Sequence, residues 1–229
     1  MNDFKLEDTP PECAVETPLP HGTLELSCED CMVLMARYPD KHFDLAIVDP
    51  PYGIGMDKGA GETKGDGRKK EDFYPPKKWD QARPAQAYFM ELKRVSQNQI
   101  ILGGNYFADL LPASRGWVYW RKLLGGNYSD GELGWTSFDQ ILREFEKQPQ
   151  RDGRRIHPTQ KPVELYAWLL ANYAKFGQRI LDTHLGSGSH AIAAHYAGIH
   201  LTACEIDPDY FAAAQERIAR ETMQTPFQF

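Results

Sequence analysis

Residues 43–53 read Phe-Asp-Leu-Ala-Ile-Val-Asp-Pro-Pro-Tyr-Gly, and this stretch decides the fold. A mostly apolar run leads directly into the tetrapeptide Asp49–Tyr52. A short apolar run of this kind predicts a buried strand of a parallel sheet, and the tetrapeptide predicts that the strand ends at a site. Asp-Pro and Pro-Pro pairs also mark ordinary turns, so other segments must supply the context.

The tetrapeptide offers a distinctive set of chemical groups. Asp49 supplies a carboxylate, Pro50 a carbonyl group held rigid because Pro51 follows it, and Tyr52 an aromatic face. This set suits an exocyclic amino group on a planar ring. The carboxylate and the carbonyl oxygen can accept the two amino hydrogens, and the ring can stack on the tyrosine.

Strand-like and helix-like segments alternate along the chain. Strand patterns cover 23–27, 43–48, 99–102, 116–121, 179–182 and 200–204, and helix patterns cover 31–38, 105–111, 162–175 and 188–197. Further helices are expected to open at Pro84 and at Pro208, the second capped by Asp207. Residues 137–145 fit either a strand or a short helix. The alternation predicts a doubly wound α/β domain with a mostly parallel sheet over 22–229, after a flexible lead-in at 1–21.

A second site is predicted at residues 180–189, which read as strand, glycine-rich turn and helix. Gly186 and Gly188 allow the backbone to close on a ligand. Glu205 ends the next strand, where an acid can bind both hydroxyl groups of a ribose. The turn lacks the dinucleotide fingerprint, so the pattern favours a nucleoside without a pyrophosphate.

Composition limits the class of protein. Hydrophobic residues make up 41% and charged residues 25%, which is typical of a globular domain. No apolar run is long enough for a membrane span and no signal pattern opens the chain, so we expect a cytoplasmic protein with no membrane partner. Cys28 and Cys31 have metal-ligand spacing, but no second pair accompanies them, and we expect no metal.

Several blocks in a fixed order resemble the β class of amino-methyltransferases, which use S-adenosylmethionine to methylate adenine N6 or cytosine N4. In this class the catalytic motif precedes the cofactor motif, on a Rossmann-like fold with permuted motif order. The resemblance implies that Asp49, Pro50, Pro51 and Tyr52 are catalytic. It implies that the cofactor is bound by Asp30, Thr159, Gln160, Lys161, Asp182, Gly186, Ser187, Gly188 and Glu205.

The chain looks most like compact orphan methylases of phages and prophages. The shared segments are 103–107, Trp120, 135–138 and 182–184. One departure is Thr183-His184, where the broader family usually has Pro-Phe. Trp120 and Trp135 are expected to be packing residues rather than base-stacking ones.

Two basic segments are candidates for DNA contact. The net charge is −6, but residues 1–30 account for −7 of it, so the remainder of the chain is close to neutral. A long loop at 53–84 carries Lys69 and Lys70, and a small insertion at 123–156 carries Arg151, Arg154 and Arg155. They can also be plain solvated loops. Insertions this small imply either a short target site or a homodimer whose two subunits share the contacts with double-stranded DNA.

The expected function is therefore methylation of N6 of a flipped adenine in duplex DNA, since aspartate at the first motif position leans to adenine in the family. Cytosine-N4 methylation uses the same geometry and is the first alternative. A non-catalytic nucleic-acid-binding subunit, an RNA methylase and a protein glutamine methylase also stay open. Carbon-5 methylation is excluded because the chain lacks the Pro-Cys nucleophile that it needs.

Overall fold

The computed structural model describes residues 22–56, 77–124, 129–149 and 155–223. Their strands form one eight-stranded sheet in the order β1-β8-β7-β2-β3-β5-β4-β6. The strands are β1 (Leu24–Cys28), β2 (Phe43–Val48), β3 (Ser96–Leu102), β4 (Trp117–Arg121), β5 (Gly131–Thr136), β6 (Arg143–Glu146), β7 (Arg179–Asp182) and β8 (His200–Glu205). Every pairing is parallel except the two made by β5.

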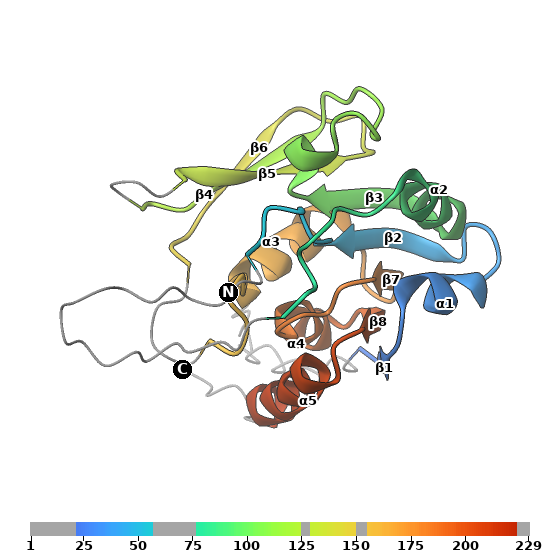
Figure 1. Cartoon of the computed structure of the whole chain (residues 1–229), viewed down its shortest axis with the longest axis vertical. Helices are drawn as coiled ribbons and strands as arrows, with labels where there is room; N and C mark the ends of the chain where they lie inside the picture. The colour runs from blue at the N-terminus through green and yellow to red at the C-terminus, as the bar shows by residue number, and fades with distance from the viewer. Residues whose placement is uncertain (1–21, 57–76, 125–128, 150–154, 224–229) are drawn as a thin grey trace, which may run out of the picture.

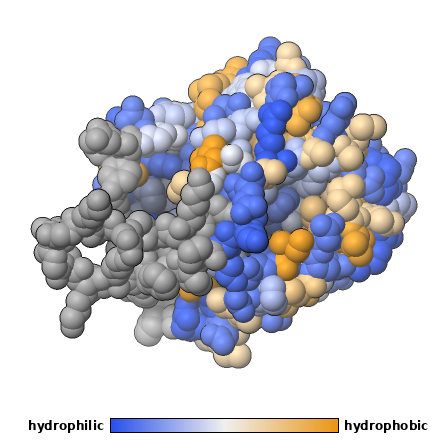
Figure 2. Space-filling model, in the orientation of Figure 1, coloured by the Kyte–Doolittle hydropathy of each residue, from blue (hydrophilic) through white to orange (hydrophobic). Residues whose placement is uncertain are grey.

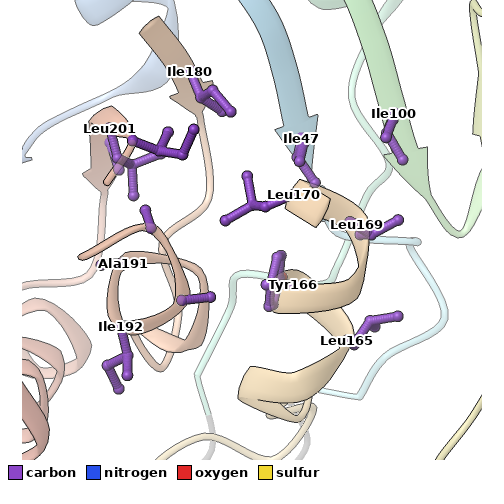
Figure 3. Packing of buried hydrophobic residues seen from close by; sticks show 14 of the residues in the cluster. Ile47, Ile100, Leu165, Tyr166, Leu169, Leu170, Ile180, Ala191, Ile192 and Leu201 are labelled. Atoms are coloured by element: carbon purple, nitrogen blue, oxygen red, sulfur yellow. The ribbon is translucent and has the colours of Figure 1, made fainter. Parts of the chain in front are cut away.

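Helices cover both faces of this sheet (Figure 1). They are α1 (Cys31–Ala36), α2 (Gln86–Val95), α3 (Val163–Tyr173), α4 (Ser189–Ala197) and α5 (Pro208–Thr222), with a 3-10 turn η1 (Gly104–Phe107) after β3. On one face α3, α4 and α5 pack on side chains such as Ile47, Ile100 and Ile180 (Figure 3). On the other face α1 and α2 pack on Phe43 and Val48. The sheet is therefore doubly wound, as the alternating pattern predicted.

The order of the strands creates a crevice between β2 and β7. From β2 the chain crosses through α2 to β3 on one side, and from β7 it crosses through α4 to β8 on the other. β2 and β7 pair directly, with Leu45 opposite Ile180. Ligands of open α/β sheets bind outside the carboxyl ends of the strands at such a switch point. The two segments singled out in the sequence, 49–52 and 183–188, lie there together.

Two expectations about the middle of the chain are wrong in detail. Residues 105–111 do not form an α-helix: η1 ends at Phe107, and Gly103 before it has a φ of 69°. A side chain on Gly104 would meet Trp135 at 2.5 Å, so the backbone here is packed against β5. The ambiguous segment 137–145 lies mostly between β5 and β6, and sequence inspection missed β5.

The described residues contain no helix long and apolar enough to cross a membrane. On the face shown in Figure 2, hydrophobic residues form separate patches among hydrophilic ones. Trp120 and Trp135 are 3% and 2% exposed, which confirms that they are packing residues.

The central packing can be tested at Leu169 of α3, which is fully buried against the sheet. We expect Leu169→Ala to lower the free energy of unfolding by about 2–5 kcal/mol, because it removes buried methyl groups and leaves a cavity. Leu142→Ala is the matched control, since Leu142 is 56% exposed. It should change stability by less than about 0.5 kcal/mol in urea unfolding. Equal effects of the two substitutions would contradict the assigned core.

Candidate active site

One cavity of about 1200 Å³ follows the carboxyl ends of the strands. Its lining joins the two predicted halves of the site, because Asp49 and Tyr52 share it with Gly186, Ser187 and Glu205. The ends of β4 and β5 form a further wall, which includes Lys122 and Glu132. The volume exceeds the range of about 300–1,000 Å³ that is usual for a single drug-sized ligand. The cavity is therefore large enough for two ligands side by side.

Asp49 is held by two donors at the end of β2. The hydroxyl of Tyr52 donates to Oδ1 of Asp49 at 2.7 Å. The ammonium of Lys161 contacts Oδ2, and it also lies 3.2 Å from the Tyr52 hydroxyl. Lys161 precedes α3 and its side chain is only 3% exposed. The residue predicted to bind the cofactor thus makes a buried ion pair with the predicted catalytic acid.

A second acid, Glu132 of β5, completes this cluster. Its Oε2 lies 3.3 Å from the Lys161 ammonium and its Oε1 contacts the ammonium of Lys122. Burial, together with the charge of Glu132, raises the pKa of Asp49 even though Lys161 opposes the shift. Burial alone would raise the pKa of Glu132, but Lys161 and Lys122 bring it below its ordinary value.

Lys161 itself stays charged. Burial disfavours its ammonium, but Asp49 and Glu132 outweigh this and raise its pKa. Two cations and two carboxylates therefore alternate along one wall of the cavity. In such a buried cluster, removal of one member leaves an uncompensated charge, which is more costly than the loss of a surface ion pair.

The ring of Tyr52 is fixed on one side. Tyr106 of η1 stacks on it with ring centroids 4.6 Å apart and an interplanar angle of 14°. A side chain on Gly103 would come within 2.1 Å of the Tyr52 ring, so glycine is required there by space as well as by its φ of 69°. Tyr106 is 37% exposed and also lines the cavity. The pair offers an aromatic surface beside the carboxylate of Asp49.

Glu205 lies in the other half of the cavity, beside the glycine-rich loop. Each of its carboxylate oxygens accepts one backbone hydrogen bond, from Gly186 at 2.9 Å and from Asp207 at 3.0 Å. A carboxylate has about four acceptor positions, so these two bonds fix its orientation without exhausting it. The glycine-rich loop is thereby tied to the end of β8, and Ile206 adds a 60% exposed apolar side chain to the same part of the lining.

Two of the predicted cofactor residues lie behind this surface. Asp182 and Gly188 are not among the lining residues. Asp182 is 1% exposed, accepts from the backbone of His184 at 3.0 Å and contacts Nδ1 of His190 at 2.9 Å. Gly188 has a φ of 77° and packs on Ile218. The structure gives both residues a role in shaping the loop.

The remaining predicted cofactor residues border the cavity. Asp30 lies after β1, where its side chain caps α1 by accepting from Met32 at 2.7 Å. Thr159 and Gln160 line the cavity ahead of Lys161. Gln160 holds its own turn, since its side-chain oxygen accepts from the backbone of Ile156 at 3.0 Å.

The long loop 53–84 is anchored at both described ends. Asp80 is buried and accepts from the backbone of Gly53 at 2.7 Å and of Met56 at 2.8 Å. At its far end Lys77 makes an ion pair of 2.9 Å with Asp207 next to α5. The ends of the loop therefore connect the catalytic and glycine-rich sides of the cavity.

Most of the predicted DNA contacts cannot be placed. Lys69, Lys70, Arg151 and Arg154 lie outside the described residues. Arg155 is described and half-buried, and its guanidinium donates to the carbonyl oxygen of Pro158. Its hydrogen bond thus supports the turn that leads to Lys161.

Sequence inspection missed Glu132, Lys122 and Tyr106 as site residues. Tyr106 lies in a segment whose resemblance to phage methylases was noted, but its stacking on Tyr52 depends on the turn η1. Glu132 reaches the site only because β5 runs antiparallel to β3 and pairs Glu132 with Trp120 of β4. No local pattern in the sequence carries that information.

A family model described as DNA methylase, N6_N4_Mtase, matches residues 114–216. The chain also matches YubD of Escherichia coli (strain K12), whose name describes a methylase, with 23% identity over 83% of this chain and 88% of that protein. The type II methyltransferase M.HpaI of Haemophilus parainfluenzae is 23% identical over 86% of this chain and 74% of its own length. The chain is thus similar in sequence to DNA methylases over most of its length, and the family model matches its second half.

Solved structures of DNA methylases share the fold. M1.HpyAVI in complex with SAM has a TM-score of 0.58 at 16% identity, over 86% of this chain and 99% of that one. The PvuII DNA methyltransferase, described as cytosine-N4-specific, has a TM-score of 0.59 at 13% identity, over 88% and 92%. The Rossmann-like methyltransferase fold expected from the sequence is confirmed.

Two histidines of the cavity, the buried His157 and the half-buried His184, make stability depend on pH. Burial lowers the pKa of His157 to about 3 and of His184 to about 4. Between pH 6.5 and 5 the unfolded chain takes up protons that the folded protein excludes. As the pH is lowered through this range, we therefore expect the free energy of unfolding to fall by up to about 1.4 kcal/mol per pH unit for each histidine.

Urea unfolding at several pH values measures this slope. His157→Gln and His184→Gln should each make the slope shallower between pH 6.5 and 5, because each removes one group that the folded state keeps neutral. If neither substitution changes the slope of the unfolding free energy against pH, the two imidazoles are not kept neutral by the folded state.

Proposed function

We propose that this protein transfers a methyl group from S-adenosylmethionine to N6 of a flipped adenine in duplex DNA. The observation that carries the proposal is the single cavity that holds Asp49 and Tyr52 at one end and Glu205 at the other. The similarity to DNA methylases supports the class of reaction. The cavity supplies adjoining places for a nucleoside cofactor and for a planar base.

The residues at the Glu205 end fit this cofactor. The oriented carboxylate can accept from both ribose hydroxyls, and Ile206 offers an apolar contact for the adenine ring. Polar side chains for the amino acid portion come from Thr159, Gln160 and Ser187, and Asp30 borders the adenine end. Asp182 and Gly188 would act through the loop that they shape.

The residues at the Asp49 end fit the target base. An aromatic amino group is a poor nucleophile because its lone pair is delocalised into the ring. Asp49 and the carbonyl group of Pro50 accept its two hydrogens, which favours a pyramidal nitrogen with a directed lone pair, and Pro51 keeps that carbonyl rigid. Tyr52 supplies the stacking surface. When bound, the cofactor supplies an electrophilic methyl group, so positioning is the main task of the protein.

The base must leave the duplex to reach this position, because its amino group is inaccessible to Asp49 while the base is stacked. We further propose that Lys69, Lys70, Arg151, Arg154 and Arg155 contact the DNA, mainly at phosphates. The small size of the segments that carry them favours a homodimer on its target.

Cytosine N4 is the second candidate. It presents the same amino geometry, and one structure that shares the fold is described as cytosine-N4-specific. Aspartate at the first motif position, Asp49 here, is the feature that leans to adenine in the resembling family. The distinction therefore needs a product analysis.

Transfer of a labelled methyl group from S-adenosylmethionine to unmethylated duplex DNA tests the proposal directly. After digestion to nucleosides, we expect the label in N6-methyladenine. Label in N4-methylcytosine would instead support the second candidate. Absence of label from DNA, with the cofactor bound, would contradict both.

Two substitutions separate the halves of the site. Asp49→Ala should lower methyl transfer by on the order of 10²–10⁴-fold, because it removes an acceptor at the reacting nitrogen. Cofactor binding, measured by calorimetry, should persist. Glu205→Gln should weaken cofactor binding instead. Asp139→Ala is the control, since Asp139 is exposed on the far loop between β5 and β6. Retained activity in Asp49→Ala would overturn the catalytic assignment.

A further inference from the structure

Glu132 lies in the active-site wall but belongs to none of the motifs that identify the family. It is the second residue of β5, opposite Trp120 of β4, and its side chain is 22% exposed. Three other polar groups reach it: the ammonium ions of Lys161 and Lys122 and the hydroxyl of Tyr52. Its position therefore depends on the sheet and on charged neighbours, not on a flexible loop.

The contacts of Asp49 present a difficulty for methyl transfer. Both of its oxygens are already engaged, one by the Tyr52 hydroxyl at 2.7 Å and the other by Lys161. A carboxylate in contact with an ammonium ion is a weaker acceptor for the hydrogens of a neutral amino group. Asp49 keeps free acceptor positions, but it accepts from the amino group of a base more strongly if its present donors are drawn toward another acceptor.

Glu132 is placed to be that acceptor. Its Oε2 is 3.3 Å from the Lys161 ammonium and 3.5 Å from the Tyr52 hydroxyl, so it already faces both donors that hold Asp49. Small rotations of the two side chains would convert these longer contacts into hydrogen bonds. No movement of the backbone is needed.

Lys122 keeps Glu132 available for this role. Its ammonium contacts the other oxygen, Oε1, and lies 5.0 Å from the centre of the Trp120 ring. The two lysines favour the ionised form of Glu132, which is the form that can accept. Oε2 is thereby left pointing toward Lys161 and Tyr52.

We propose that Glu132 is a positioning residue for methyl transfer, which takes over Lys161 and the Tyr52 hydroxyl when the target amino group binds Asp49. This inference rests on the proposed function. It adds to it an exchange of partners within the site, so that Lys161 balances Asp49 in the free protein and Glu132 in the complex with the base.

The competing explanation is that Glu132 only balances the charges of the two lysines. Under that explanation its loss would lower stability and, through its charge alone, move the acid limb of the pH profile, but it would leave kcat on the plateau above that limb unchanged. Partner exchange predicts in addition a lower kcat on that plateau, because without Glu132 neither Lys161 nor the Tyr52 hydroxyl has a second acceptor to move to.

The test compares Glu132→Gln with wild type in the labelled methyl-transfer assay. We expect kcat to fall by on the order of 100-fold, as for a misplaced reacting group, while the Kd for S-adenosylmethionine changes by less than about threefold. The acid limb of the profile of kcat/KM against pH should move to lower pH. Removal of the negative charge of Glu132 lowers the pKa of Asp49, because Glu132 no longer repels that carboxylate and Lys161 then pairs with Asp49 only.

Glu146→Gln is the matched control, because Glu146 lies on β6 with a 48% exposed side chain and pairs with Arg121 at 3.0 Å. It should match wild type. Glu132→Asp keeps the charge, but its shorter side chain cannot reach both donors together, so we expect about a tenfold lower kcat. This variant provides the test if Glu132→Gln does not fold.

The outcomes distinguish failure of the proposed function from failure of the partner exchange. If wild type transfers no methyl group to DNA, the proposed function fails. If wild type is active and Glu132→Gln keeps the wild-type rate, the partner exchange is overturned. A lower rate with an unshifted acid limb also overturns it, because the carboxylate of Glu132 would then not act on Asp49. If only Glu132→Asp folds, an undiminished kcat overturns it.

Discussion

The arrangement of the whole site depends on one buried cation, the ammonium of Lys161 between the carboxylates of Asp49 and Glu132. Each member comes from a different part of the chain: the end of β2, the start of β5 and the turn before α3. Because a buried charge is tolerated only with its partners, these segments are constrained to meet. The backbone at Lys161 is in turn fixed by α4, since Ser189 donates to its carbonyl oxygen at 2.7 Å. The ion pair of Lys161 with Asp49 and the hydrogen bond from Ser189 thus connect the catalytic half of the cavity with the glycine-rich half.

Much of this architecture was predictable, because the strongest signals are local. The apolar run before Asp49 and the glycine-rich turn at 186–188 each predict a strand that ends at a site, and parallel strands bring such ends to one edge. Glu205 was placed in the cavity by the same reasoning. Asp207 as the cap of α5 is confirmed, with hydrogen bonds from the backbone of the first turn.

The rest depends on contacts between distant segments. The segment 131–136, Gly-Glu-Leu-Gly-Trp-Thr, has little β-strand character of its own and is held as β5 by pairing with both β3 and β4. Glu132 is therefore invisible in the sequence as a neighbour of Asp49. Lys161 was associated with the cofactor through its motif, whereas its contact with Asp49 spans 112 positions of the chain. Long-range electrostatic pairing of this kind leaves no periodic signal.

The wall formed by β4 and β5 has a consequence for which parts of the cavity can change independently. The glycine-rich loop and Glu205 belong to β7 and β8 on one side of β2, whereas the wall beside Asp49 comes from β4 and β5 on the other side. β4 and β5 pair with each other, with β3 and with β6, and in the described part of the chain neither pairs with β7 or β8, so side chains of the wall can change while β7 and β8 keep their pairing. The surface beside Asp49 can therefore vary without disturbing the half of the cavity that holds Glu205.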